Sequence, residues 1–240
     1  MTRIALVTGA TKGIGFEIAR QLGAAGVTVL VGARDADRGE HAVAQLAAGG
    51  ADAAAVRLDV TDAASVAAAA AWIDERYGRL DALVNNAGIA LEAPGPASGT
   101  SVDVLRATYE TNVFGVVAVT NAMLPLLRRA PAARIVNVSS GLGSLTQTTG
   151  PDAVWSRYPL LAYASSKTAV NALTVQYANE LRGTPIKVNS ADPGYCATDL
   201  NRHSGPRTAA QGAAVSVRLA LLPDDGPTGE FHDDDGPVPW

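Results

Sequence analysis

The sequence predicts an α/β fold in which helices cover both faces of a doubly wound parallel sheet. Six short runs rich in Val, Ile and Leu alternate with longer segments of helical spacing, which is the pattern of repeated βαβ units. The runs are apolar throughout, as expected for strands that are buried on both faces of a sheet. The six expected strands are Ile4–Val7, Val27–Val31, Ala53–Leu58, Leu80–Val84, Ala133–Val138 and Ile186–Ala191.

Apolar residues between these runs recur at helical spacing. After the first strand, Ile14, Ile18 and Leu22 are each four residues apart, so they share one face of a helix. Thr61 and Asp62 are residues that favour the start of a later helix. The chain therefore alternates strands and helices along most of its length.

The C-terminal segment, Gly226–Trp240, is expected to add a seventh strand around Glu230 and Phe231. The tail beyond this strand packs either on its own chain or on another copy, and the sequence leaves both open. The short acidic run Asp233–Asp235 is interpreted as a solvated turn.

Length and composition favour one domain spanning residues 1–240. The net charge of −4 provides no basic surface for nucleic acid. The single cysteine, Cys196, excludes an internal disulfide, and the three scattered histidines provide no zinc ligand set, so neither a disulfide nor a metal is expected. A first strand at Ile4 leaves no room for a secretory signal, and no apolar run reaches the length of a membrane span. A cytoplasmic protein without membrane partners is expected.

A glycine-rich segment, Thr8–Gly15 ("TGATKGIG"), lies between the first strand and the first helix. A tight turn at a helix N-terminus binds phosphate, because unpaired amides and the helix dipole both favour an anion. Gly9 would form the turn, Gly13 would let the backbone approach a pyrophosphate, and Gly15 would allow close packing of the helix. The alternative is an ordinary glycine-rich turn.

The glycine spacing, T-G-x-x-x-G-x-G, resembles that of the short-chain dehydrogenase/reductase family. Further family motifs follow in the family's order: Asp59-Val60, Asn85-Asn86-Ala87-Gly88, Asn112, Ser140, Tyr163-x-x-x-Lys167 and Pro193-Gly194-Tyr195-Cys196-Ala197-Thr198. With Lys12, Arg34 and the segment VNNAGIAL, the chain looks most like the carbonyl reductase subgroup. The resemblance implies a Rossmann-like sheet of about seven strands and an NADP-dependent oxidoreductase that acts on CH-OH groups.

The resemblance implies four catalytic residues, Asn112, Ser140, Tyr163 and Lys167. Hydride transfer to a carbonyl leaves an alkoxide that must be protonated, so a general acid is required. A tyrosine titrates near ~10, so it needs an adjacent cation to lose its proton, and Lys167 lies four residues beyond Tyr163 on the same helix face. In the family, the serine stabilises charge on the substrate oxygen, the lysine also binds the nicotinamide ribose, and the asparagine anchors a water.

Each of these residues also has a simpler interpretation. Tyr163 and Lys167 are also compatible with a surface pair at helical spacing, and Ser140 with a cap at the end of a strand. Ser139 is the adjacent competitor for the role of Ser140, and the family pattern favours the second serine. Cys196 is interpreted as a packing residue beside the cofactor.

The resemblance also implies a set of cofactor-binding residues. They are Gly9, Lys12, Gly13, Ile14, Gly15, Arg34, Asp59, Val60, Asn86, Tyr163, Lys167, Pro193, Gly194 and Thr198.

The end of the second strand lacks the acidic residue that binds the ribose 2′-hydroxyl of NAD. Arg34 lies just beyond it, and Lys12 adds a second cation, so a clamp on a 2′-phosphate and a preference for NADPH are expected. Asp35 is a possible partner for the hydroxyl, but it is better placed as the N-cap of the next helix.

Three polar segments, Glu92–Ser101, Gly141–Pro159 and Asn201–Thr208, follow strands four, five and six. They are interpreted as loops at the carboxyl ends of the strands, where ligands bind in open α/β sheets. The stretch Gly141–Ala162 is longer than in typical family members, and its aromatic and apolar residues indicate a wall of the substrate pocket. The alternatives are a cover for the helix through which many members dimerise, or a solvent loop with an apolar anchor. A monomer or homodimer is favoured over a tetramer. The segment contains Trp155, Tyr158, Pro159, Leu160 and Leu161.

These observations predict an NADPH-dependent reductase that transfers a hydride to an aldehyde, ketone or quinone to give an alcohol. The alternatives are an NAD-dependent alcohol dehydrogenase working in the oxidative direction and a non-catalytic NADPH-binding sensor. A serine hydrolase is disfavoured because the chain has no G-x-S-x-G motif.

Overall fold

The computed structural model describes residues 2–150 and 153–240 and contains a parallel sheet of seven strands in the order β3-β2-β1-β4-β5-β6-β7. The predicted doubly wound sheet is confirmed, including its short last strand. Strand ends differ from the predicted ones by one or two residues, because apolar runs continue into the adjoining loops. The strands are β1 Ile4–Thr8, β2 Thr28–Ala33, β3 Ala53–Arg57, β4 Ala82–Asn85, β5 Arg134–Val138, β6 Lys187–Ala191 and β7 Phe231–His232.

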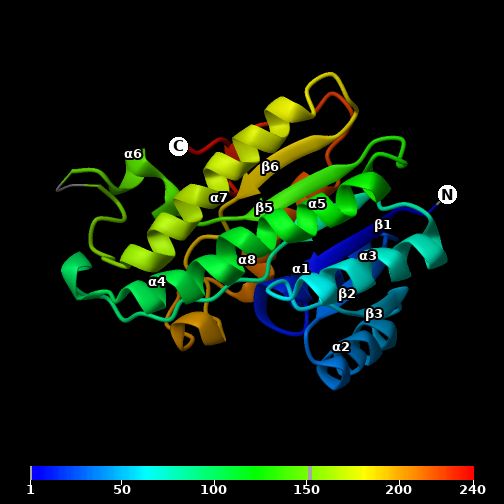
Figure 1. Ribbon diagram of the computed structural model, residues 1–240, viewed down its shortest axis with the longest axis horizontal. Helices are drawn as coiled ribbons and strands as arrows, with labels where there is room; N and C mark the ends of the chain where they lie inside the picture. The colour runs from blue at the N-terminus through cyan, green and yellow to red at the C-terminus, as the bar shows by residue number, and fades with distance from the viewer. Residues whose placement is uncertain (1, 151–152) are drawn as a thin grey trace.

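Helices cover both faces of the sheet (Figure 1). One face packs against α1 Gly13–Ala24, α2 Ala36–Ala48 and α8 Ala209–Ala220. The other packs against α3 Ala63–Tyr77, α5 Gly115–Leu127 and α7 Leu161–Glu180. Because the central strands contribute side chains to both layers, they are mostly apolar on both faces, as the sequence indicated.

Side-chain caps fix the starts of two predicted helices. The Asp35 carboxylate accepts the Arg38 N–H at 3.0 Å and begins α2, and the Asp62 carboxylate accepts the Ala64 N–H at 2.9 Å and begins α3. Both N-cap predictions are confirmed. Asp35 is thereby engaged in the helix start.

A long apolar stretch, Val102–Leu127, combines α4 Val102–Tyr109, a π-helical turn at Glu110–Phe114 and α5. By length and composition alone it is suited to span a membrane, but 56% of its window is buried within the protein. Its inner side supplies Val119 and Met123 to the core. This burial is that of a core helix.

The predicted loop at 141–159 is in part helical, which corrects the sequence-based interpretation. A short helix, α6 Leu145–Thr148, begins at Ser144, whose hydroxyl accepts the Gln147 N–H at 3.1 Å. A four-residue helix has no periodicity to detect, so the sequence gives no signal for it.

The C-terminal tail packs on its own chain. The rings of Trp240 and Phe231 are stacked, with centroids 5.7 Å apart and planes 14° apart. This contact answers the question that the sequence left open.

Candidate active site

The predicted phosphate-binding turn lies at the carboxyl end of β1. Gly9 and Gly13 have φ values of +63° and +58°, a region that favours glycine. A Cβ on Gly15 would lie 2.3 Å from Asn86 Nδ2 and 2.5 Å from the Gly9 carbonyl oxygen. The sequence therefore needs glycine at all three positions, two for backbone conformation and one for close packing.

Asn86 attaches this turn to the end of β4. Its side-chain amide donates to the Thr8 carbonyl at 2.8 Å, and the Thr8 hydroxyl accepts the backbone N–H groups of Asn86 and Ala87, both at 2.9 Å. The role predicted for Asn86 beside the cofactor is thus combined with a structural one. The side chain holds two neighbouring strand ends in register.

The N-terminus of α1 differs from those of α2, α3, α4 and α8. Within the part of the chain that the structure describes, no side chain caps α1, whose N-cap residue is Lys12. The amides at this helix start and the positive end of the helix dipole are therefore suited to an anion. Other helices begin with capping side chains at Asp35, Asp62, Ser101 and Thr208. The site fits the pyrophosphate of a dinucleotide.

The two predicted cations lie in exposed positions. Arg34 is exposed at the end of β2. Hydrogen bonds from the Thr61 amide and hydroxyl, together with the charge of Arg34, lower the pKa of Asp59. Lys12 forms an ion pair of 2.5 Å with Asp199, which lies two residues before the polar segment Asn201–Thr208 and also contacts His203.

Ser140 and Tyr163 lie together beyond the end of β5. Burial raises the pKa of Tyr163 to about 12, the charge of the Asp192 carboxylate adds to this rise, and the neighbouring Ser140 hydroxyl opposes it. Ser139 is fully buried and its hydroxyl donates to the Lys167 carbonyl at 3.3 Å, so the geometry favours Ser140 over its neighbour.

Lys167 is buried beneath Tyr163 on α7. Its ammonium lies 5.6 Å from the centroid of the Tyr163 ring and donates to the Val138 carbonyl at 2.7 Å. Burial lowers the pKa of Lys167 to about 8, and the charge of Asp192 partly opposes this. The tyrosine and lysine are thus an inward-facing pair, and the surface-pair interpretation is wrong.

Asn112 lies in the π-helical turn between α4 and α5 and is buried. Its side chain accepts the Ile89 N–H and donates to the Ile89 carbonyl, both at 2.9 Å, and also donates to Ser166 at 3.0 Å. A Cβ on Gly88 would lie 3.5 Å from Asn112 Oδ1 and 3.6 Å from Lys167 Nζ. The structure therefore brings Asn112 and Lys167 to the same small region.

The Pro193–Thr198 segment follows β6 and approaches the glycine turn. Gly194 has a φ of +70°, and a Cβ on Gly13 would lie 3.7 Å from the Thr198 methyl group. Cys196 is buried, its thiol donates to the Pro193 carbonyl at 3.1 Å, and burial raises its pKa. Cys196 is therefore a packing residue, as expected.

The sequence analysis missed Asp192, a buried carboxylate at the centre of this site. It directly precedes the proline-glycine pair and accepts the Gly194 N–H at 2.9 Å. Burial raises its pKa, and hydrogen bonds from the Gly194 and Gly141 amides oppose that rise. Asp192 thus joins two loops, and its charge raises the pKa of the nearby Tyr163.

Glu92 is a second residue that sequence reasoning missed. Its carboxylate accepts the backbone N–H of Tyr163 at 2.7 Å and the Thr100 hydroxyl at 2.9 Å. This side chain, 71 residues away in the sequence, satisfies an amide in the first turn of α7. Only the tertiary structure shows this cap.

The long segment before Tyr163 packs on the outer side of α7. A cavity of about 630 Å³ lies between them, lined by Leu142, Trp155 and Tyr158 of the segment and by Ala164 and Thr168 of the helix. This placement supports the interpretation in which the segment covers α7. Trp155 also borders Gly141, so the same segment reaches the catalytic side.

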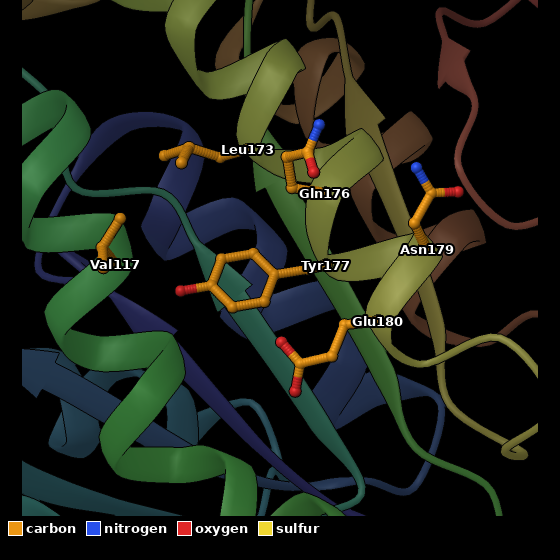
Figure 2. A pocket seen from close by; sticks show the side chains of 6 residues that line it. All are labelled: Val117, Leu173, Gln176, Tyr177, Asn179 and Glu180. Carbon is orange, nitrogen blue, oxygen red and sulfur yellow. The ribbon is translucent and has the colours of Figure 1, made fainter.

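A second groove lies on the outer surface between α5 and α7 (Figure 2). Its volume is about 540 Å³, and Tyr177 within it donates to Asn121 at 2.8 Å. Tyr177 follows Tyr163 by fourteen residues on α7, a helical distance of about 21 Å at 1.5 Å per residue. The groove is therefore separate from the catalytic residues. Its lining residues are Val117, Leu173, Gln176, Tyr177, Asn179 and Glu180.

Comparison with known proteins identifies the family. The model of the short chain dehydrogenase family matches residues 3–209. The chain is 35% identical to (−)-isopiperitenone reductase of Mentha piperita, over 95% of this chain and 95% of the relative. It is 36% identical to carbonyl reductase (NADPH) 1 of Sus scrofa, over 100% of this chain and 94% of the relative. Among solved structures, an NADPH-bound carbonyl reductase from chicken fatty liver superposes with a TM-score of 0.87 and 29% identity, covering 100% of this chain and 99% of the other.

The chain belongs to the short-chain dehydrogenase family. These matches confirm the expected fold class and the expected NADP-dependent oxidoreductase most like carbonyl reductases. The roles of the individual site residues remain predictions, which the geometry above makes specific.

Proposed function

We propose that this protein is an NADPH-dependent reductase that transfers a hydride to the carbonyl group of an aldehyde, ketone or quinone and releases an alcohol. The observation that carries the proposal is the buried Lys167 ammonium 5.6 Å from the centre of the Tyr163 ring, with the Ser140 hydroxyl near enough to lower the pKa of the phenol. This arrangement places a proton donor and a second hydroxyl where a carbonyl oxygen can be bound by both. The names of the matched reductases support the same reaction.

Residues around the glycine turn would hold the cofactor. The uncapped α1 N-terminus would bind the pyrophosphate, and Arg34 with Lys12 would bind the 2′-phosphate. Lys12 would exchange its present partner, Asp199, for the phosphate. Asp59 and Val60 would lie along the adenine, and Thr198 would approach the carboxamide. When bound, NADPH supplies the hydride.

The side chains of the protein complete the reaction. Ser140 and Tyr163 would donate hydrogen bonds to the carbonyl oxygen, which stabilises its developing negative charge. Tyr163 would then transfer its phenolic proton to that oxygen. The positive charge of Lys167 would stabilise the phenolate that remains, and Asn112 would anchor a water through which the proton is replaced.

Asp192 has a defined effect in this scheme. Its negative charge raises the pKa of Tyr163 and so opposes the phenolate. The ammonium of Lys167, as a nearby positive charge, would favour the phenolate. Tyr163 is therefore kept protonated until the carbonyl oxygen becomes basic. This state is suited to reduction, in which the tyrosine must begin as the acid.

A cytoplasmic monomer is proposed for the assembled protein. The segment before Tyr163 lies over the outer side of α7, at Ala164 and Thr168, and so obstructs one helical face for a second copy. Light scattering after size exclusion tests the assembly. A mass of one chain supports the proposal, and a tetramer contradicts it.

The experiment that tests the activity is Tyr163→Phe. Loss of the proton donor should lower the rate of NADPH oxidation by about 10²-fold or more, since general acid catalysis contributes that much. NADPH binding, followed by fluorescence, should remain close to wild type because the ring itself is retained. Undiminished turnover by this variant would remove Tyr163 from the mechanism.

A further inference from the structure

The C-terminal tail holds the short helix α6 in place. The Ser144 hydroxyl donates to the Pro239 carbonyl at 2.7 Å, and the Thr146 amide and hydroxyl donate to the main-chain oxygen of Trp240 at 3.0 and 2.8 Å. Trp240 is in turn stacked on Phe231, which is buried in β7. Helix α6 is thus attached to the sheet although it lies in a long loop.

Gln147 of α6 holds the indole of Trp155. The indole N–H donates to Gln147 Oε1 at 3.0 Å, and the Trp155 backbone N–H donates to the Gln147 carbonyl at 3.2 Å. Two bonds between one pair of residues fix both the backbone and the ring orientation of the tryptophan. Trp155 is partly buried, so the bonds are shielded from competing water.

The fixed indole lies beside the catalytic serine. A Cβ on Gly141, the residue after Ser140, would lie 2.2 Å from Trp155 Nε1 and 2.9 Å from Asp192 Oδ2. Because Gly141 has no side chain, the indole of Trp155 can lie directly against its backbone. Trp155 therefore reaches the loop that carries Ser140 and the carboxylate that acts on Tyr163.

Two tyrosines extend this ring surface toward the polar segment Asn201–Thr208. The centroids of Trp155 and Tyr158 are 5.8 Å apart, as are those of Tyr158 and Tyr195. The Tyr195 hydroxyl is 2.6 Å from the Ser204 hydroxyl, which lies in the segment Asn201–Thr208. The three rings thus form a continuous aromatic surface from the loop after β5 to that segment.

We propose that Trp155 is a specificity-determining residue for the carbonyl substrate and that Gln147 is the residue that positions it. The inference rests on the proposed function, because it concerns which carbonyl compounds reach Ser140 and Tyr163. A substrate with a ring beside its carbonyl group would pack on the indole, whereas a short linear compound would not reach it. The C-terminal tail, through its hydrogen bonds to α6, keeps the indole of Trp155 in place.

Two bulk-matched substitutions separate the hydrogen bond from the bulk of the side chain. Gln147→Met keeps the length of the side chain but removes the acceptor for the indole N–H. Gln147→Glu keeps an acceptor oxygen at the same position. Trp155→Ala removes the indole itself. The double variant Gln147→Met with Trp155→Ala tests whether both residues act through one interaction.

The assay compares kcat/KM for 2-methyl-1,4-naphthoquinone with kcat/KM for 2,3-butanedione, with NADPH saturating. Gln147→Met should lower the ratio about fivefold, the effect of one lost hydrogen bond, mainly through KM for the quinone. Trp155→Ala should lower it further, Gln147→Glu should keep the wild-type ratio, and the double variant should match Trp155→Ala. KM for NADPH should not change in any variant.

The outcomes distinguish this inference from the function beneath it. A wild-type enzyme that reduces no aldehyde, ketone, diketone or quinone would overturn both. An enzyme that reduces other carbonyl compounds but not the naphthoquinone would overturn the specificity role alone. Reduction of both compounds with an unchanged ratio in Trp155→Ala would overturn the specificity role alone. The positioning role would be overturned if the kcat/KM ratio of the double variant fell well below that of Trp155→Ala. It would also be overturned if Gln147→Glu lowered this ratio as much as Gln147→Met.

Discussion

Removing the Glu92 carboxylate should displace the catalytic tyrosine. Glu92 accepts the backbone N–H of Tyr163 at 2.7 Å and is itself held by Thr100 at 2.9 Å. The amide lies in the first turn of α7, where helix N–H groups have no partner within the helix. Glu92→Ala leaves this amide unpaired and frees the loop that carries residue 92 from the helix.

The expected magnitude follows from helix capping. Loss of a capping side chain costs about 1 kcal/mol of stability, which lowers Tm by about 2–4 °C in a chain of this size. The effect on rate should be larger than the effect on stability, because a small displacement of a catalytic group has a steep cost. We expect kcat for reduction to fall about tenfold. KM for NADPH should change less, because the pyrophosphate would be held at the glycine turn and not by the start of α7.

Thermal unfolding and NADPH oxidation measure both effects, with two control variants. Glu92→Gln keeps an oxygen acceptor and should restore most of the stability and kcat. Glu180→Ala removes an exposed carboxylate at the other end of α7, where Glu180 pairs with Arg128, and should change neither quantity appreciably. If Glu92→Ala matched wild type in kcat, the reasoning would be refuted. It would also be refuted if Glu92→Gln were as impaired as Glu92→Ala.

Two further predictions concern charge. Arg34→Ala should raise KM for NADPH about tenfold or more while changing KM for NADH little, because only NADPH carries the 2′-phosphate; equal effects on both cofactors in steady-state assays would remove Arg34 from the clamp. Burial lowers the pKa of Lys167 from 10.5 to about 8, so the unfolded chain binds more protons than the folded chain between these values. The stability of the cofactor-free protein should therefore gain a contribution as pH rises from about 8 to 10, and urea unfolding of Lys167→Met should lack that contribution. The same pH dependence in both proteins would show that Lys167 is not the group responsible.

Patterns among neighbouring residues predicted most of the fold. The seven strands, and the caps at Asp35 and Asp62, could be predicted because continuous apolar runs and helix-start residues are properties of neighbouring residues. Helix α6 could not, since one turn of helix has no repeat and depends on contacts with Pro239 and Trp240. Strand ends were also imprecise, because burial continues beyond the last ladder hydrogen bond.

The candidate site divides in the same way. Residues within short motifs, such as Tyr163 and Lys167, were found from the resemblance of those motifs to the family pattern. Asp192, Glu92 and Gln147 were not, because each acts through a contact with another loop or helix. Glu92 reaches across 71 residues to Tyr163, and no spacing rule connects two such positions. Asp192 adjoined a motif, and a buried acid immediately before the proline-glycine pair is a signal that sequence reasoning can use.

The account depends most directly on whether the protein oxidises NADPH in the presence of a carbonyl compound. The decisive measurement is the loss of NADPH absorbance, with NADH in parallel, against a panel of aldehydes, ketones, diketones and quinones. The account predicts turnover of at least one carbonyl class with kcat/KM clearly higher for NADPH than for NADH. Cofactor binding without turnover of any compound would contradict it and would favour a sensor. Faster oxidation of alcohols with NAD would instead favour a dehydrogenase.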